Sequence, residues 1–398
     1  MNADVVVIGG GVVGASAAYH LARAGARVTL VDRADAGQAT AAGAGIIAPG
    51  TSLRPLPAFY PFGYAAARAY PGLIANLAED GEPETGFAVV GLLFVATTDD
   101  EAARLPETVA LFRSRAAEDP TVGEVAALSG AEARALFPPL ADVPAALRVS
   151  GAARVDGRLL RDALRGAAAR RGATIIHGDA IPQISAGRVT GVQVGDQRIA
   201  ADALVVAGGA WSNAIGDALG VRLPTEPQRG QILHLRLRGT RTAGWPIVIG
   251  FHGSYLLTFP EERVVAGATR ETGSGYAPWP TAGGVHSALG EALRLAPGLA
   301  GATLDEVRVG LRPASPDGLP MLSAVPGLAN VWAATGHGPS GLQLGPFSGA
   351  VVADLVLGRA VAVDLGAFGV GRFAQSASGV RCGPRGGQAG AGRADRGR

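Results

Sequence analysis

The sequence predicts an α/β fold with a parallel sheet near its N-terminus and at least two domains. Three observations support this prediction. Residues 5–8 are apolar and β-branched, a glycine-rich turn and an alanine-rich stretch follow, and residues 28–31 are again mostly apolar, which is typical of a βαβ unit. A second apolar run, at 202–207, also ends in glycine. At 398 residues, the chain is longer than one hydrophobic core usually supports.

The glycine-rich turn has the spacing G-x-G-x-x-G, and an acidic residue closes the unit. Gly9 permits a tight turn, Gly11 lets a pyrophosphate approach the backbone, and Gly14 lets the helix and the strand pack closely. The N–H groups at the helix start face the phosphates. Asp32 follows the second strand, where its carboxylate can accept hydrogen bonds from an adenosine ribose. The unit predicts an adenine dinucleotide site without distinguishing FAD from NAD, and an ordinary βαβ unit is the alternative.

Composition excludes several other classes of protein. Hydrophobic residues make up 48% of the chain, but no uninterrupted apolar run reaches the roughly eighteen residues that would span a membrane. The single cysteine, Cys382, allows no internal disulfide and gives no reason to propose a metal site. The first strand begins too early to leave room for a signal peptide, so we expect a cytoplasmic protein. The sequence contains no lysine, which excludes pyridoxal phosphate chemistry on a lysine Schiff base.

The formal net charge of +2 is unevenly distributed. Residues 381–398 contain five arginines and one aspartate, a net of +4, which leaves −2 for the rest of the chain. Because the C-terminal segment is rich in glycine, alanine and arginine and lacks apolar periodicity, we expect residues 374–398 to form a disordered tail. An arginine-rich tail is able to contact nucleic acid, but a solvated extension is the favoured interpretation. No nucleic-acid partner is therefore predicted.

Between these ends the chain alternates small-residue stretches with longer patterned segments. Residues 39–49 are small enough to let backbone approach a ligand closely. We expect helices near 64–80, 100–118, 158–171 and 342–357, and strands near 91–97, 174–177, 202–206, 231–237, 255–259, 264–269 and 331–335. The strands between 221 and 309 suggest an antiparallel sheet.

Several of these segments, taken in order, carry a family resemblance. The blocks are the dinucleotide unit, 39–45 (ATAAGAG), 205–212 (VVAGGAWS), 227–231 (PQRGQ), 265–271 (VAGATRE), 310–320 (GLRPASPDGLP) and 334–338 (ATGHG). The chain resembles the FAD-dependent amine and amino-acid oxidoreductases, the family of glycine oxidase, D-amino-acid oxidase, D-amino-acid dehydrogenase and sarcosine oxidase. The resemblance extends from residue 4 to about 373 and identifies the cofactor as FAD rather than NAD.

The resemblance implies a Rossmann-like FAD-binding domain assembled from three segments, 1–50, 145–220 and 310–373. A mixed-sheet α+β substrate-binding domain, formed by 51–144 and 221–309, is inserted in two pieces and covers the flavin ring. We expect the active site between these layers.

The same blocks imply which residues contact the cofactor. The expected FAD-binding residues are Gly9, Gly11, Val12, Val13, Gly14, Asp32, Arg33, Thr40, Ala41, Ala42, Gly43, Gly45, Ile46, Ile181, Ala207, Gly208, Gly209, Trp211, Gly310, Arg312, Gly336, His337, Gly338, Pro339, Ser340, Gly341 and Leu342. Covalent FAD attachment in the family uses a cysteine just after the Gly-His-Gly region or a histidine near the first glycine-rich stretch. Cys382 lies in the tail, and no histidine occurs between His20 and His177, so FAD is expected to be non-covalent.

Two residues are expected to act on the substrate. A guanidinium can grip a substrate carboxylate bidentately, and the resemblance gives this role to Arg312 of the Gly-Leu-Arg-Pro block; a structural arginine bonded to carbonyls is the alternative. Tyr255 matches a tyrosine that hydrogen-bonds the same carboxylate, with plain packing as its alternative. His252 is more simply a surface turn residue, and His337 is expected to contact the flavin without acting as a base.

The implied reaction is oxidative deamination of glycine, a D-amino acid or an N-substituted glycine. A hydride passes from the α-carbon to flavin N5, and the resulting imine is hydrolysed to an oxo acid. Because the oxygen-activating lysine of sarcosine oxidase has no counterpart, the electron acceptor is either O2 or a quinone-linked carrier. A biosynthetic tailoring oxidase acting on an unusual amino acid, a flavoprotein subunit of a larger complex and an NAD(P)-dependent dehydrogenase are the alternatives, and homo-oligomerisation is left open.

Overall fold

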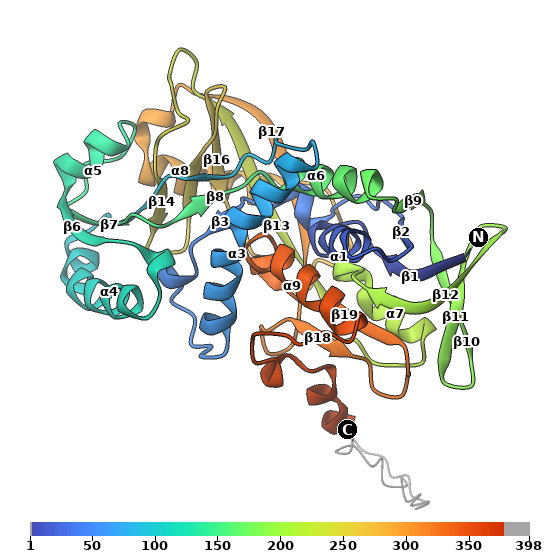
Figure 1. Ribbon diagram of the computed structural model, residues 1–398. Coiled ribbons are helices and arrows are strands. Elements are labelled where there is room, and N and C mark those ends of the chain that lie inside the picture. Colours follow the sequence, from blue (N-terminus) through green and yellow to red (C-terminus); the bar gives the residue numbers. More distant parts are fainter. Residues whose placement is uncertain (1, 378–398) are drawn as a thin grey trace, which may run out of the picture.

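The computed structural model describes residues 2–377 and contains two eight-stranded sheets, here called sheet A and sheet B (Figure 1). Sheet A lies toward the N-terminus on the right of Figure 1, and sheet B lies toward the upper left. The 3-10 helix η7 (Val370–Ala377) runs four residues into the predicted tail, and the rest of that tail lies outside the described residues. Within the described range, no helix combines the length and apolarity needed to cross a bilayer.

Sheet A has the parallel core that the βαβ unit predicts. Its strands run in the order β9-β2-β1-β12-β19-β18, and the β10–β11 hairpin pairs with the first half of β12. The bounds are β1 (Asn2–Ile8), β2 (Val28–Asp32), β9 (Thr174–His177), β10 (Ala180–Ser185), β11 (Arg188–Val194), β12 (Gln197–Val206), β18 (Met321–Ala324) and β19 (Val331–Thr335). Strands β9, β2, β1, β12 and β19 are mutually parallel, whereas β18 and the hairpin are antiparallel additions at one side.

Helices cover both faces of sheet A because its strands are apolar on both sides. On β1, Val5 and Val7 face one buried cluster, and Val6 and Ile8 face another, as the period of two requires. The first cluster includes residues of α1, α3, α6 and α9, and α7 flanks the second. Their bounds are α1 (Val12–Arg23), α3 (Phe59–Glu79), α6 (Gly157–Arg170), α7 (Ser212–Ala218) and α9 (Gly341–Val356).

Sheet B is built from two stretches of chain, 92–149 and 226–314, each of which runs a few residues past the end of a predicted insertion. Its order is β17-β13-β16-β15-β14-β5-β7-β6, and every neighbouring pair is antiparallel except β14 with β5. The bounds are β5 (Leu92–Ala96), β6 (Val125–Ser129), β7 (Ala145–Val149), β13 (Glu226–Arg236), β14 (Ile247–Gly250), β15 (Tyr255–Thr258), β16 (Arg263–Gly267) and β17 (Thr303–Ala314). The antiparallel pairing expected between 221 and 309 is confirmed, and β17 carries it on to residue 314.

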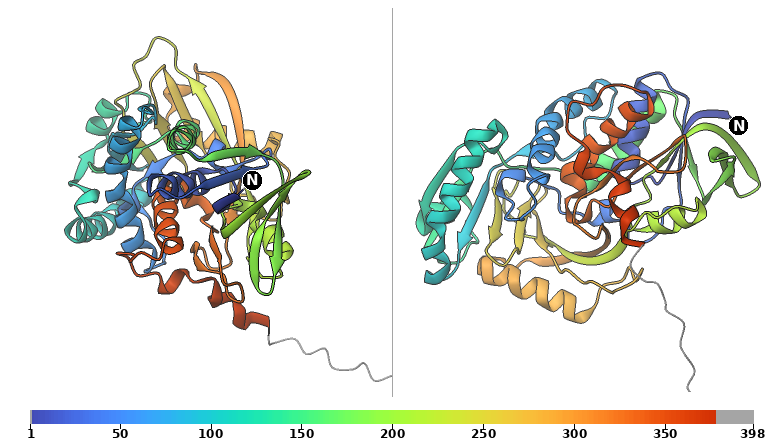
Figure 2. Two further views of the ribbon diagram at one scale, coloured as in Figure 1. Left: turned by 45° about the vertical axis from the view of Figure 1, so that its right-hand side comes forward. Right: turned by 90° about the horizontal axis from the view of Figure 1, so that it is seen from below.

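Helices also cover sheet B on both faces. Helices α5 (Gly130–Leu136) and α8 (Ala282–Leu295) pack on one face, and α4 (Asp99–Glu118) packs on the other. Both views in Figure 2 place the α4–α5 end and the β10–β11 hairpin at opposite ends of the molecule. The remaining short elements are α2 (Ala39–Ala42), β3 (Ile46–Ile47), β4 (Ala88–Val89), β8 (Ala153–Arg154), η1 (Pro49–Thr51), η2 (Pro120–Val122), η3 (Gly209–Trp211), η4 (Pro297–Leu299), η5 (Gly338–Ser340) and η6 (Gly366–Phe368).

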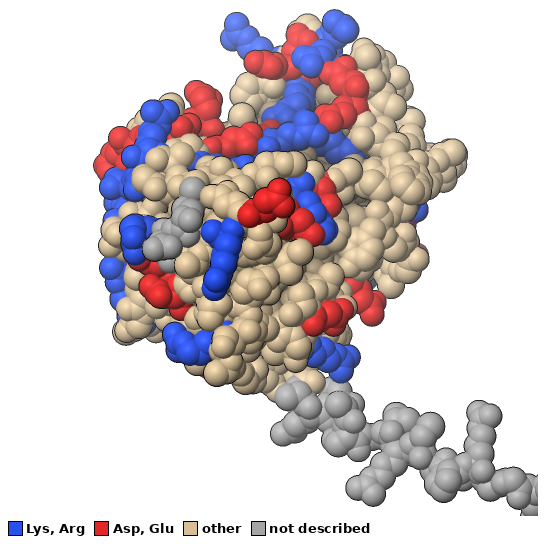
Figure 3. Space-filling view, turned by 90° about the vertical axis from the view of Figure 1, so that its right-hand side faces the viewer, with Lys and Arg blue, Asp and Glu red and all other residues tan. Residues whose placement is uncertain are grey.

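Positive and negative side chains are mixed on the face of the molecule on which the N-terminal strand lies. Figure 3 shows basic and acidic side chains interspersed among broad uncharged areas. Ion pairs such as Arg27 with Asp4 at 2.7 Å are part of the surface of the chain. On this face, positive charge is therefore not gathered into one continuous patch.

Candidate active site

One long cavity begins at the carboxyl ends of β1 and β2 and continues to β15 and β17, so it joins the two sheets. Ligands in such folds bind where the parallel strands end. The expected FAD-binding residues that line it are Gly9, Gly11, Val12, Val13, Asp32, Arg33, Thr40, Ala42, Gly43, Gly45, Ile46, Ile181, Ala207, Gly208, Gly209, Trp211, Gly310, Arg312, His337, Gly338, Pro339, Gly341 and Leu342. Gly14, Ala41, Gly336 and Ser340 are not among the described residues that line it.

The glycines of the βαβ unit have the geometry that their spacing predicts. Gly9 has φ +105°, and a β-carbon there would overlap the carbonyl of Ala207. A β-carbon at Gly14 would overlap the carbonyl oxygen of Gly9, which explains why Gly14 serves packing rather than the cavity wall. At the start of α1, the Val12 N–H donates to the Thr40 hydroxyl at 3.0 Å.

Asp32 lies at the end of β2 with its carboxylate almost buried. The side chain of Gln38 donates to it at 3.2 Å, and Arg165 contacts it at 3.3 Å. A β-carbon at Gly10 would come within 2.6 Å of this carboxylate, so glycine is required beside it. Arg33 points instead to Asp35 and Asp179.

The cavity wall fits an adenine dinucleotide. Gly209 and Gly338 line it with φ +56° and +53°, and a β-carbon at either position would meet no atom within 4 Å. At the ends of β12 and β19, main chain without side chains therefore borders the open space of the cavity. A flat ligand can approach the main chain closely there. Asp32 supplies the acceptor for a ribose at the opposite end of the cavity.

At the far end of the cavity, Arg312 of β17 presents its guanidinium above Gly230. A β-carbon on Gly230 would overlap that guanidinium, so the neighbouring strand makes room for it. One guanidinium nitrogen, Nη1, donates to the carbonyls of Thr269 at 3.0 Å and Arg229 at 3.3 Å. No acidic side chain among the described residues forms an ion pair with Arg312, and burial lowers its pKa. The group keeps N–H donors for an anion from the cavity.

Tyr255 opens β15 and lines the same end of the cavity. Burial raises the pKa of its hydroxyl to about 12, although the charges of Arg312 and Arg270 lower it in part. The hydroxyl is therefore protonated at neutral pH and available as a donor. Its neighbour Gly267 has no side chain to obstruct it, because a β-carbon there would come within 2.7 Å of the tyrosine oxygen.

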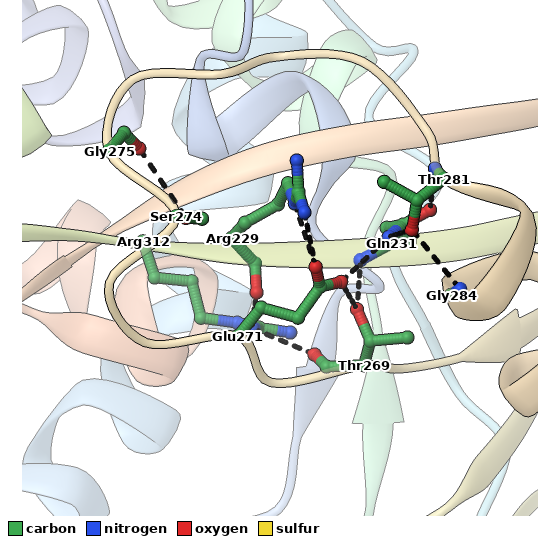
Figure 4. Close-up of polar contacts among 9 residues, drawn as sticks. All are labelled: Arg229, Gln231, Thr269, Glu271, Ser274, Gly275, Thr281, Gly284 and Arg312. Atoms are coloured by element: carbon green, nitrogen blue, oxygen red, sulfur yellow. Dashed lines mark hydrogen bonds and ion pairs between the residues drawn. The ribbon is translucent and has the colours of Figure 1, made fainter.

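A network of hydrogen bonds holds the two carbonyls to which Arg312 donates (Figure 4). The Glu271 carboxylate accepts from Arg229 at 2.6 Å, from Gln231 at 2.6 Å and from the Thr269 hydroxyl at 2.6 Å. Burial raises the pKa of Glu271, but these hydrogen bonds outweigh it and the net shift is downward. Gln231 also bonds Thr281, which caps α8. The sequence analysis recognised the blocks that contain Arg229 and Glu271 but assigned neither residue a role. In the structure, the two side chains form an ion pair.

Replacing Glu271 by glutamine should lower the unfolding free energy by about 1–3 kcal/mol, because Arg229 loses its charged acceptor and Gln231 faces a second amide. Thermal unfolding of the two proteins at pH 7 measures the change. Glu226→Gln, on the same strand as Arg229 but exposed, is the matched control. Equal melting temperatures for wild type and Glu271→Gln would contradict the stabilising role.

His337 contacts the cavity from a buried position in the turn before α9. Its Nε2 lies 2.9 Å from the Ser348 hydroxyl, and burial lowers its pKa to about 4. The ring is therefore neutral near pH 7. His252 lies in an exposed turn, 3.4 Å from Glu101, in agreement with the surface interpretation.

Acid should destabilise the fold through its buried histidines. Burial lowers the pKa of His234 to about 3 and that of His337 to about 4, whereas an unfolded histidine titrates near 6.5. As the pH falls, the unfolded state therefore binds protons before the folded state does. The free energy of unfolding is highest above pH 6.5 and decreases as the pH falls toward 4. The loss is about 1.4 kcal/mol for each unit by which the folded and unfolded pKa values differ. His234→Gln should show a shallower fall of melting temperature over this range. His286→Gln, exposed on α8, should keep the wild-type slope, and an unchanged slope in His234→Gln would contradict the assignment.

Two further arginines, which the sequence analysis did not select, lie at the substrate end. Arg54 donates to the Ser340 hydroxyl at 2.7 Å, just before α9. Arg270 follows Thr269 and lines the cavity with an exposed side chain. Arg270 stood inside a recognised block, but nothing in the linear pattern indicates that Arg54 lies near enough for the charge of Arg270 to act on it.

Known proteins match this architecture over most of the chain. Residues 4–355 match the family described as FAD dependent oxidoreductase. YurR, an uncharacterized oxidoreductase of Bacillus subtilis, is 43% identical over 91% of this chain and 97% of its own length. The glycine oxidase of Pseudomonas putida is 30% identical over 92% of this chain and 97% of its own. The crystal structure of iminodiacetate oxidase from Chelativorans sp. BNC1 superposes with a TM-score of 0.89 at 42% identity, covering 92% of this chain and 98% of that chain.

These matches agree with the cavity in which the glycine unit, Asp32 and Arg312 meet. They confirm the α/β fold, the FAD cofactor and the enzyme class that the sequence indicated, namely an FAD-dependent oxidoreductase. The chain belongs to the family of FAD-dependent oxidoreductases.

Proposed function

We propose that this protein oxidises the bond between nitrogen and the α-carbon of a glycine-type substrate, with Arg312 holding the substrate carboxylate. The observation that carries the proposal is the buried Arg312 guanidinium, which lines the cavity beside Tyr255 without an acidic partner among the described residues. A buried cation without an acidic partner is costly, and a carboxylate substrate supplies the missing negative charge.

Each side chain has a defined task in this proposal. Arg312 orients the carboxylate by paired N–H donors, and the protonated Tyr255 hydroxyl donates to the same group. The two contacts would fix the position of the α-carbon in the cavity. The FAD cofactor, when bound, supplies the acceptor for the hydride. The neutral His337 and the small residues of the wall exclude water without offering a competing base.

Among glycine, D-amino acids and N-substituted glycines, we favour the N-substituted glycines. The support is the 42% identity to iminodiacetate oxidase, which is named for an N-substituted glycine, compared with 30% identity to a glycine oxidase. Loss of two electrons and two protons gives an imine, and water then splits it into an oxo acid and an amine.

We also propose O2 as the electron acceptor and non-covalent binding of FAD. Both relatives just named are oxidases, and O2 that takes the two electrons and two protons becomes hydrogen peroxide. Acid precipitation should release the flavin into the supernatant, and turnover in air should yield one peroxide per oxo acid.

Anaerobic mixing of the purified holoenzyme with single compounds tests the proposal. Glycine, D-alanine, N-methylglycine and iminodiacetate form the panel, with acetate as the control that lacks an amine. Loss of flavin absorbance with at least one of the four amines, followed by its return in air, is the expected result. Flavin that stays oxidised with all four would overturn the proposal.

A further inference from the structure

The substrate end of the cavity contains more positive charge than one carboxylate requires. Arg312 and Arg270 line it there, and Arg54, which is not a lining residue, donates to Ser340 in the turn before α9. No acidic side chain of residues 2–377 forms an ion pair with any of the three arginines. The charges of Arg270 and Arg312 both act on Arg54. The nearby carboxylate of Glu271 is already bound by Arg229. Like charges held together cost free energy, which a second anion would offset.

The backbone explains why three residues far apart in sequence meet. Arg312 donates to the carbonyl of Thr269, and Arg270 is the next residue along the chain. Two positions after Arg312, Ala314 of β17 bridges to His337. The turn that begins at His337 leads to Ser340, whose hydroxyl accepts from Arg54 at 2.7 Å. Arg270 and Arg54 are thus both tied to Arg312 through neighbouring main chain.

The two outer arginines differ in how firmly they are held. Arg54 is half-buried, with its guanidinium 5.4 Å from the centre of the Phe59 ring and one nitrogen on Ser340. Arg270 is exposed and has no hydrogen-bond partner among the described residues. An arginine that is held in place and one whose donors are unpaired can together bind an anion.

We propose that Arg54 and Arg270 form a second carboxylate site, so that the preferred substrate is a dicarboxylic secondary amine with one acid group on Arg312 and the other on this pair. The inference rests on the proposed function and adds no chemical step to it. Arg312 holds the acid group next to the carbon that is oxidised, and the pair holds the acid group on the nitrogen substituent.

Two matched substrates test the site. Iminodiacetate carries two carboxylates, and its monoamide, N-(carbamoylmethyl)glycine, has the same shape with one charge removed. Wild type should prefer the diacid in kcat/KM by about tenfold or more, as expected for a charge-assisted contact. Arg270→Ala and Arg54→Lys should each reduce that preference, chiefly through KM of the diacid, and leave the monoamide within about threefold. Arg188→Ala, which removes one positive charge from the β10–β11 hairpin, should keep the wild-type preference.

Binding without turnover provides a second readout. Diglycolate replaces the amine by an ether oxygen and forms no imine, and methoxyacetate is its one-acid counterpart. Calorimetry on the holoenzyme should show tighter binding of diglycolate, and Arg270→Ala should remove the difference. Equal kcat/KM for diacid and monoamide, or equal losses for both substrates in the variants, would overturn the second site while leaving the proposed function intact. If no amine reduces the flavin and diglycolate does not bind, both proposals fail.

Discussion

Replacing Arg312 by alanine is expected to lower kcat/KM by about 30- to 1,000-fold, which corresponds to ~2 to 4 kcal/mol. The guanidinium lies at the substrate end of a partly closed cavity, where a carboxylate that loses its partner stays desolvated and uncompensated. Steady-state kinetics with the best substrate of the panel measure the loss. The ratio of flavin to protein absorbance checks that the cofactor remains bound.

Two further substitutions sharpen this result. Arg312→Lys keeps the charge but not the planar pair of donors, so it should fall between wild type and alanine. Arg308→Ala removes a positive charge from the same strand, where Arg308 is paired with Glu306 at 2.7 Å, and should affect catalysis little. If Arg312→Ala kept wild-type kinetics, the arginine would have only the structural role of bonding the carbonyls of Thr269 and Arg229.

A second large effect is expected at the other end of the cavity. Gly11→Leu should yield folded protein that contains no flavin. Gly11 has φ −67°, so a side chain there causes no backbone strain, and its β-carbon would first meet the Thr40 hydroxyl at 3.2 Å. The rest of a leucine side chain would occupy the space in front of α1, where the pyrophosphate belongs.

Flavin absorbance and far-ultraviolet circular dichroism separate loss of cofactor from loss of fold in Gly11→Leu. Gly290→Ala on α8 is the control, because a β-carbon at Gly290 meets no atom within 4 Å and alanine favours the helix. Full flavin occupancy in Gly11→Leu would contradict the assigned place of the phosphates.

The sequence predicted the parts of the fold whose chemistry is local. The G-x-G-x-x-G spacing and Asp32 placed the βαβ unit correctly, because the turn, the helix start and the acidic residue all lie within one short stretch of chain. Long periodic segments were also predicted well: α4 (Asp99–Glu118) and α6 (Gly157–Arg170) match their expected bounds closely. In both helices a threonine or aspartate cap strengthens the signal.

Other elements were missed for physical reasons. Helix α8 contains Gly283, Gly284 and Gly290, which weaken its intrinsic propensity, and it is held by packing of Leu295 on sheet B. Its glycine at 284 is required because a β-carbon there would overlap the Gln231 side chain. That contact joins residues more than fifty positions apart, and no linear pattern reports it.

At the substrate end of the cavity, too, some residues were predicted from the sequence and others were not. Arg312 and Tyr255 were selected because their blocks resemble a family pattern, and both line the cavity. The ties of Arg229 and Gln231 to Glu271, and of Arg54 to Ser340, depend on strand register and on the position of the turn before α9. Such ties follow from tertiary packing, so one sequence alone does not reveal them.

Strand β17 connects the grip on the substrate to the wall of the cofactor cavity. Leu311 donates its N–H to the carbonyl of Gly37 at 2.8 Å, and Ala314 bridges to His337, so the residues on both sides of Arg312 are fastened to the dinucleotide-binding part. These main-chain contacts therefore fix the distance between the substrate carboxylate, bound by Arg312, and the part of the cavity in which the carbon to be oxidised must lie. A β-amino acid has one extra methylene between its acid and its amine. With its acid group on Arg312, the carbon that bears nitrogen would lie one bond beyond the position of the α-carbon, so the compound should remain unreacted.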